Sequence, residues 1–193
     1  MIKMPFAVLL ALLPISVAQS DSAPVAHFRS HSIAPGSAAP LPDAKITPGV
    51  ADPVAVADLT KAPHMVDGVE RNICATDFRT EPIRSSIKDF EKLKKEVCTE
   101  YGLTACDASS EGDHLVSIEN GGCKDCLTNL WPQPEDAEGV VGFHTKDIVE
   151  NRTHDLICTG KVTLEQGQRG LADDWYQFAK DNNILPTKQE IVK

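Results

Sequence analysis

The chain has 193 residues, of which 24% are charged and 41% hydrophobic, and a formal net charge of −9. This negative charge argues against a protein that coats nucleic acid through a broad basic surface, because such binding depends on Lys and Arg contacting phosphates. It leaves open an enzyme that holds a few phosphates through a metal ion and a local basic patch.

Residues 1–18 have the pattern of a secretory signal peptide. Lys3 supplies a short basic start, and an apolar run from Phe6 to Val17 follows. Small residues at Ser16 and Ala18 occupy the two positions that a signal peptidase reads, so we expect cleavage after Ala18. The run is too short for a typical membrane span, and its small-residue ending argues against an uncleaved anchor. We therefore expect a secreted or periplasmic protein.

Residues 19–66 are rich in Ala, Pro, Ser and Val and show no amphipathic period. Such a segment buries too little apolar surface to offset the entropy lost when the chain is ordered. We therefore expect a disordered, exposed tether over 19–66. A domain over 67–180, of a size at which a single core is feasible, and a C-terminal tail over 181–193 complete the expected organisation.

The first elements predicted within the domain are a helix and a hairpin. The helix begins at Ser86 as N-cap, carries apolar residues at helical spacing, and is closed by Gly102. Residues 113–119 are predicted as a short strand and residues 127–131 as its return, ended by prolines. The Asn120-Gly121-Gly122 turn joins them, since glycine takes positive φ freely.

Two further helices are predicted after a polar, acidic loop. The first covers residues 146–158 and has Gly160 just beyond its end. The second begins at a capping box formed by Thr163 and Gln166, and its apolar stripe includes Trp175. Strand, turn, strand, long loop and helix is therefore the predicted order.

Six cysteines lie in the second two-thirds of the chain. An even number in an exported protein favours disulfides, although spacing does not choose among the pairings. The pair Cys123 and Cys126 also has the spacing of half a zinc site, but a four-ligand site needs a second close pair, which the sequence lacks. Disulfides are therefore the favoured use of the cysteines, which are Cys74, Cys98, Cys106, Cys123, Cys126 and Cys158.

The residues of the predicted hairpin suit the hydrolysis of a phosphodiester. This reaction needs a base to activate water and a cation to offset charge on the phosphate. His114 is the candidate base, because imidazole titrates near physiological pH. Asp113 is a candidate metal ligand if the strand bends or ends there, since neighbouring strand residues point to opposite faces. Asn129, on the returning strand, is placed to orient His114.

The helix over 146–158 is expected to complete the metal shell. Asp147, Glu150 and His154 are spaced i, i+3 and i+7, which places them on one face of a helix.

In this order the residues resemble the HNH endonucleases, a family with a ββα-metal fold. The resemblance covers about Ile73 to Phe178 and is closest to small exported bacterial proteins of HNH type. It is carried by Asp113-His114-Leu115-Val116, Glu119, Gly121-Gly122, Asn129-Leu130-Trp131-Pro132-Gln133-Pro134, Lys146-Asp147, Glu150-Asn151, His154, Cys158-Thr159-Gly160 and Asp174-Trp175.

The resemblance implies an α+β fold with a small HNH-like core, flanking helices and disulfide staples. It makes His114 the general base and Asn129 the residue that orients it, with Asp113 and His154 as metal ligands. The gap from Asn129 to His154 is longer than is usual in the family. Other candidates for the helix ligand are His144, Glu150 and Asn151.

The sequence also departs from the family at its cysteines. The paired cysteine knuckles that hold zinc in many HNH enzymes are absent, and Cys123 and Cys126 lie in a turn that is usually free of cysteine. The resemblance suggests that disulfides replace the zinc staple, with Cys74–Cys158 as one pair.

The leading hypothesis is an exported HNH-type endonuclease that hydrolyses phosphodiester bonds in nucleic acid with Mg²⁺, Mn²⁺, Zn²⁺ or Ni²⁺. The alternative is a catalytically inactive, disulfide-stabilised binding module that keeps the HNH-like fold. A third hypothesis is a toxin-like effector with an immunity protein as partner. Metal-dependent cutting of plasmid distinguishes the first two.

Overall fold

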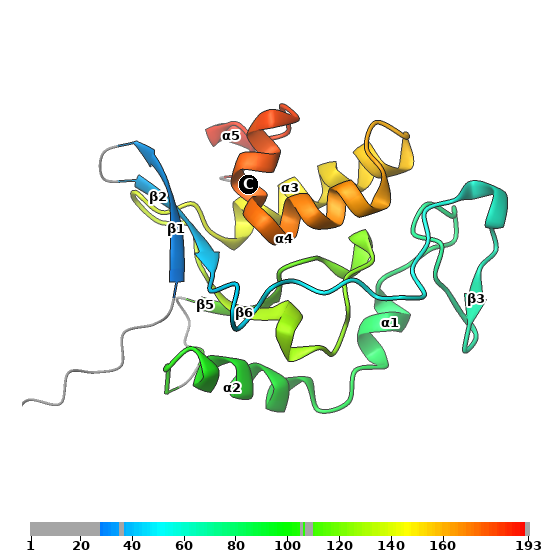
Figure 1. Ribbon diagram of the computed structural model, residues 1–193, viewed down its shortest axis with the longest axis horizontal. Helices are drawn as coiled ribbons and strands as arrows, with labels where there is room; N and C mark the ends of the chain where they lie inside the picture. The colour runs from blue at the N-terminus through cyan, green and yellow to red at the C-terminus, as the bar shows by residue number, and fades with distance from the viewer. Residues whose placement is uncertain (1–27, 35–36, 105, 107–109, 192–193) are drawn as a thin grey trace, which may run out of the picture.

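The computed structural model describes residues 28–34, 37–104, 106 and 110–191, so the predicted signal peptide over 1–18 lies outside the described residues. Helices and two-stranded antiparallel sheets alternate along the described chain, which confirms the α+β class (Figure 1). The strands are β1 (Phe28–Ala34), β2 (Ser37–Pro42), β3 (Met65–Val66), β4 (Val69–Glu70), β5 (Ser110–His114) and β6 (Leu130–Pro134). The α-helices are α1 (Glu81–Ser85), α2 (Phe90–Glu100), α3 (Phe143–Cys158), α4 (Leu164–Asp181) and α5 (Lys188–Ile191). Three short 3-10 helices are η1 (Leu59–Lys61), η2 (Ile118–Asn120) and η3 (Leu127–Asn129).

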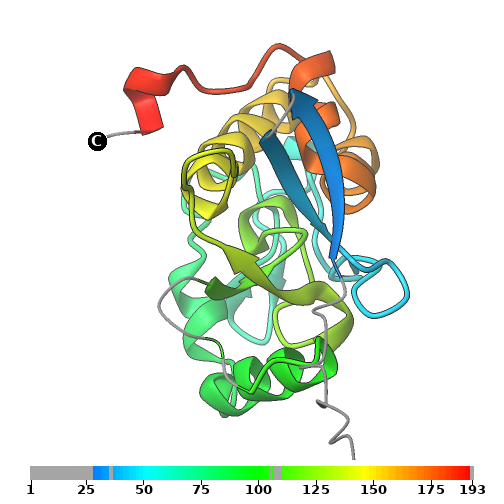
Figure 2. The same ribbon diagram turned by 90° about the vertical axis from the view of Figure 1, so that its left-hand side faces the viewer.

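The pair β5 and β6 lies in the middle of the molecule. The strands are antiparallel, with His114 opposite Leu130 and Asp113 opposite Trp131. Helix α2 lies on one side of the pair, and α3 and α4 lie on the other (Figures 1 and 2). The hairpin therefore separates two helical layers, and its residues face either layer in alternation.

The predicted helix from Ser86 begins later than expected. Asp89 adopts a left-handed conformation, with φ 52° and ψ 46°, and α2 starts at the next residue. Asp tolerates this region better than most residues, so the chain turns here between α1 and α2. The end is as predicted, because the residue two beyond the helix, Gly102, has φ 74°.

The predicted strands are shifted along the chain. Strand β5 ends at His114, and η2 forms over residues that were expected to continue the strand. The return strand begins at Leu130 after η3. Pro132 lies within β6, and β6 ends at the other predicted proline, Pro134. A two-stranded sheet leaves an open edge on each strand, where a missing N–H is tolerated.

Helices α3 and α4 confirm the two predicted C-terminal helices, with α3 beginning at Phe143, three residues before the predicted start. The Thr163 hydroxyl accepts a hydrogen bond from the Gln166 amide at 3.1 Å, and the Gln166 side chain accepts one from the Thr163 amide at 2.8 Å. This reciprocal capping box starts α4. Leu171 and Trp175 from α4 are fully buried and belong to one core with Val149 of α3.

The segment expected to be an exposed tether over 19–66 differs from that expectation in its described part. Ala39 is fully buried and Leu41 is 6% exposed, both in the core with Trp175. The Thr47 hydroxyl donates to the Leu130 carbonyl at 2.8 Å. A segment with little apolar surface of its own can still be ordered by distant elements that offer a core and hydrogen-bond partners. Residues 19–27 lie outside the described residues.

The expected domain boundary at residue 180 also differs from the structure. Ile184, in the predicted tail, is 8% exposed and packs in the same core as Leu171. The core therefore draws on residues beyond both ends of the range 67–180.

Three disulfides join the six cysteines, as Cys74–Cys158, Cys98–Cys106 and Cys123–Cys126. The pair Cys74–Cys158 suggested by the resemblance is one of them. Such bonds are compatible with an extracellular location. Within the described part of the chain, no helix combines the length and the apolar character needed to cross a membrane.

Candidate active site

Asn129 holds together the chain around the end of β5. Its side-chain oxygen accepts hydrogen bonds from the amides of Val116 at 3.0 Å and Val50 at 3.2 Å. Its side-chain nitrogen donates to the carbonyls of Val116 and Cys123, both at 2.9 Å. These four bonds go to backbone groups, so Asn129 fixes the path of the chain beside His114 and acts on the imidazole only indirectly.

The Gly-Gly turn is required by close backbone approach. A Cβ atom on Gly122 would lie 1.8 Å from the Val116 carbonyl oxygen and 3.0 Å from the Asn129 side-chain nitrogen. Gly121 has φ 72°, in the left-handed region that glycine takes without strain. The turn thus allows the Asn129 amide to reach both chain segments.

His114 lies on the face of β5 that points toward α2. It is 2% exposed, and its ring stacks on Phe90 with centroids 5.9 Å apart and an angle of 8° between the planes. Its Nε2 lies 2.8 Å from the Lys124 carbonyl oxygen. A carbonyl only accepts, so Nε2 carries the proton and Nδ1 has the lone pair in the neutral ring. Burial lowers the pKa of His114, which favours this neutral form.

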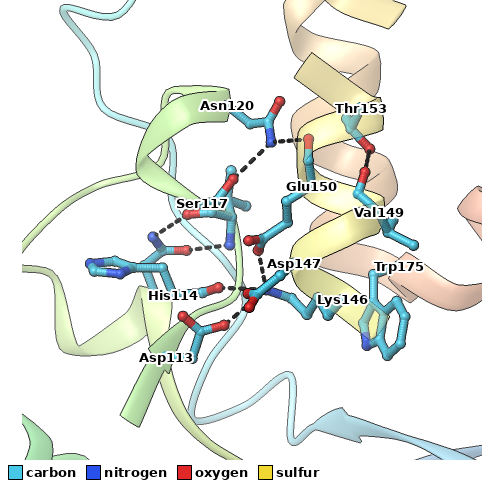
Figure 3. A network of polar contacts seen from close by, with 12 residues as sticks. Asp113, His114, Ser117, Asn120, Lys146, Asp147, Val149, Glu150, Thr153 and Trp175 are labelled. Atoms are coloured by element: carbon cyan, nitrogen blue, oxygen red, sulfur yellow. Dashed lines mark hydrogen bonds and ion pairs between the residues drawn. The ribbon is translucent and has the colours of Figure 1, made fainter. Parts of the chain in front are cut away.

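Asp113 lies on the opposite face of β5 and contacts α3. Its carboxylate pairs with the Lys146 ammonium at 3.1 Å. Lys146 is fully buried, also pairs with Glu150, and donates to the His114 carbonyl at 2.8 Å. Figure 3 shows the His114 imidazole pointing away from these carboxylates. The expected convergence of Asp113 and His114 on one metal is therefore not observed, because alternate strand residues face opposite ways.

The positive charge of Lys146 is compensated by the carboxylates of Asp113 and Glu150. Burial alone would lower the pKa of Lys146, but the charges of Asp113 and Glu150 outweigh that effect and raise it. The lysine is therefore a buried cation that links β5 to α3. Glu150, proposed from the sequence as a metal ligand, is engaged in this link.

Beside the Lys146 network lies a second group of ionisable side chains. Burial raises the pKa of Glu119, while the charges of His154 and Arg84 act in the opposite direction. Loss of hydration and the charge of Asp113 raise the pKa of Asp147 to about 6. His154, Arg84 and Asp147 thus lie within electrostatic range of Glu119.

The His154 ring is oriented by a backbone carbonyl and by an aromatic neighbour. Its Nε2 lies 2.9 Å from the Ile73 carbonyl oxygen, so this nitrogen carries the proton and Nδ1 has the lone pair. Metal-binding histidines usually donate their other ring N–H to a carbonyl or carboxylate in this manner. The half-buried ring stacks on Phe78, with centroids 6.4 Å apart.

The other ligand candidates are placed elsewhere. Asp113 and His154 have separate partners, so the structure does not bring this predicted pair together. Asn151 is exposed and donates to the Asp147 carbonyl within α3. His144 is exposed and lies 3.7 Å from Glu135.

One group of three metal-binding side chains was found close together in the described ranges, and it consists of Cys123, Asp125 and Cys126. The two sulfurs are joined in a disulfide, so they are not thiolate ligands.

Sequence reasoning did not place Lys146, Glu119 or Arg84 beside the candidate site. A lysine with a carboxylate four residues later is the usual pattern of an exposed helical pair, so nothing local signalled the burial of Lys146. Glu119 had a signal, because a carboxylate directly before the Asn-Gly-Gly turn is fixed close to the end of β5. Arg84 lies in α1, far from the motif in sequence.

Comparisons of the chain with protein-family models, with curated proteins and with solved structures find no match.

Proposed function

We propose that the protein is an exported hydrolase that cuts phosphodiester bonds in nucleic acid with a divalent metal ion, using an HNH-type core made of β5, β6 and α3. One observation carries this proposal. The Nε2–H of His114 is fixed on the Lys124 carbonyl at 2.8 Å, which makes Nδ1 the basic atom of a neutral imidazole.

The tautomer and the lowered pKa of His114 suit a general base. Its lowered pKa keeps the ring neutral at physiological pH, so Nδ1 can accept a proton from an attacking water. The Lys124 carbonyl then stabilises the imidazolium that forms, because its oxygen carries partial negative charge. Asn129 maintains this geometry by holding the backbone on both sides of the ring.

His154, Glu119 and Asp147 have donor atoms that a divalent cation takes, but they are not gathered around one point in the described structure, so a cation would have to draw them together. An imidazole nitrogen with two carboxylates suits Mn²⁺, Zn²⁺ or Ni²⁺, and a more oxygen-rich shell suits Mg²⁺. A bound cation would supply positive charge to the phosphate and to the leaving oxygen. Asp113, which the resemblance made a ligand, instead holds Lys146 in this proposal.

Arg84 is the candidate contact for the phosphate of the substrate. It is exposed in the last turn of α1 and acts electrostatically on both Glu119 and His114. A guanidinium there would bind phosphate oxygens through charge-assisted hydrogen bonds.

A second candidate function is the binding module without catalysis. The observation that favours it is the 2% exposure of His114, because a general base must contact water and substrate. In this candidate the His114–Phe90 stack is a core contact, and the Lys146 network is a structural link.

Plasmid cleavage by the oxidised protein tests the proposal, with each of the four metal ions and with chelator. We expect metal-dependent cutting that His114→Ala reduces by about 10²- to 10⁴-fold, the usual contribution of a general base. His64→Ala, at a histidine beside β3, is the matched control and should cut like the parent. Absence of cutting by the folded parent with every metal would favour the binding module.

Isothermal titration with Mn²⁺ tests the metal site separately. We expect His154→Ala to weaken Mn²⁺ binding, because Nδ1 of His154 is the proposed nitrogen ligand. Binding that is unchanged in this variant would remove His154 from the site.

A further inference from the structure

The loop from Cys123 to Cys126 is closed by a disulfide and directly contacts the two central residues of the candidate site. The Lys124 carbonyl accepts from His114 Nε2 at 2.8 Å, and the Cys123 carbonyl accepts from the Asn129 side chain at 2.9 Å. The Cys126 carbonyl accepts from the Asn129 amide at 2.9 Å. Three of the four loop residues therefore use their carbonyls to hold His114 or Asn129.

Apart from its disulfide and these contacts, the loop has little to fix its shape. Asp125 is exposed, and the ion pair between the side chains of Lys124 and Asp125 is an exposed contact that contributes little stability. The Cys123 amide donates to the Val50 carbonyl at 2.8 Å and anchors one end. Covalent closure therefore adds a constraint on the position of the Lys124 carbonyl to those that the hydrogen bonds supply.

We propose that the Cys123–Cys126 disulfide is a redox-controlled positioning element, which holds the Lys124 carbonyl against His114 when closed and releases it when reduced. Its effect on cleavage rests on the proposed function. Its effect on His114 follows from the contacts alone, because the Lys124 carbonyl is what assigns the proton to Nε2.

The redox step is an ordinary thiol–disulfide exchange with a dithiol. The dithiol supplies two electrons and two protons, the S–S bond breaks, Cys123 and Cys126 become thiols, and the dithiol becomes a disulfide. Both cysteines are half-buried and flank the exposed Asp125, and Cys74 and Cys158 are half-buried too. Cys98, within α2, is by contrast fully buried.

The test replaces only this disulfide, in the double variant Cys123→Ser/Cys126→Ser, and compares it with Asp125→Ser in the same loop. Long-range ¹H–¹⁵N spectra report which nitrogen of His114 carries the proton, and cleavage kinetics report kcat and KM. We expect the parent and Asp125→Ser to show the Nε2–H tautomer alone. The double variant should show mixed tautomers and a kcat reduced by about 10-fold or more, with KM little changed, because part of the general-base contribution is lost.

The outcomes separate the two proposals. A double variant with the parent's tautomer and kcat would overturn the positioning role and leave the nuclease proposal intact. A change of tautomer in a protein that never cuts would support the positioning role and reject the nuclease.

If the double variant unfolds, the same spectra are recorded on the parent during reduction with dithiothreitol. Alkylation and mass spectrometry then identify which disulfide has opened. A tautomer change that follows the opening of Cys123–Cys126, and reverses on reoxidation, supports the positioning role. An unchanged tautomer after this opening rejects it.

Discussion

Polar side chains are stabilised in different ways on the two faces of β5. On the face toward α3, Asp113 is part of an ionic network around the buried Lys146. On the face toward α2, the adjacent His114 is neutral, stacked on Phe90 and held by one backbone carbonyl. Two neighbouring residues that look like one catalytic pair in the sequence therefore lie in separate environments.

The free energy of unfolding should therefore respond most to the loss of a charge on the α3 face, and to the loss of a hydrogen bond on the α2 face. A buried charge without its partner costs several kcal/mol, because desolvation is no longer compensated. An unpaired buried amide or carbonyl costs about 1–3 kcal/mol. Variants on the two faces should therefore differ in size of effect and in dependence on pH.

The largest effect on stability is expected from Lys146→Met. The methionine fills much of the space, but it leaves the carboxylates of Asp113 and Glu150 facing each other without a cation. The free energy of unfolding in urea should fall by about 3–5 kcal/mol. Lys180→Met, at an exposed lysine of α4, is the control and should change it little. A loss below about 1 kcal/mol for Lys146→Met would show that the charge of Lys146 does not offset the buried carboxylates of Asp113 and Glu150.

Asn129→Ala is expected to have the next largest effect. It removes four hydrogen bonds and leaves the buried amide and carbonyl of Val116 without this partner. We expect a loss of about 3 kcal/mol in the free energy of unfolding, measured in urea. Asn151→Ala, at an exposed asparagine of α3, should be close to neutral. Equal losses for the two variants would contradict the bridging role of Asn129.

Asp147→Asn should change how stability depends on pH. The pKa of Asp147 is raised from 3.8 to about 6, so the folded protein binds this proton more tightly than the unfolded chain. Its stabilising contribution is complete below the unfolded pKa and is lost as the pH rises through about 6.

The parent should therefore lose stability relative to Asp147→Asn between about pH 4 and pH 7, as measured by urea unfolding at each pH. A difference between the two proteins that stays constant over this range would show that the pKa of Asp147 is not raised in the folded state.

The smallest effect is expected at the exposed pair Arg169 and Glu165 on α4. Their charged groups are 4.0 Å apart, and the side chains are 73% and 81% exposed. Arg169→Ala should change the free energy of unfolding by no more than about 0.5 kcal/mol in the same urea experiment. A loss as large as that of Lys146→Met would show that burial does not determine how much an ion pair contributes to stability.

The sequence was informative where the structure depends on neighbouring residues. The capping box at Thr163 and the need for glycine at 122 depend on residues a few positions apart or on local backbone geometry. Asn129 was recognised as central, but its bonds go to backbone groups and not to the His114 ring. The start of α2 was misplaced because a left-handed Asp89 leaves no mark in the apolar spacing.

The order of hairpin and helices and the residue types around the hairpin were predictable from the sequence, and the α+β class from the family resemblance. The structure was needed to show that residues 39–50 complete the core, that Lys146 is buried, and that Asp113 and His114 face different layers. The reason is physical. The Lys124 carbonyl sets the proton position on the His114 imidazole, and the Leu130 carbonyl holds the buried Thr47 hydroxyl. The fold brings both carbonyls close from other parts of the chain.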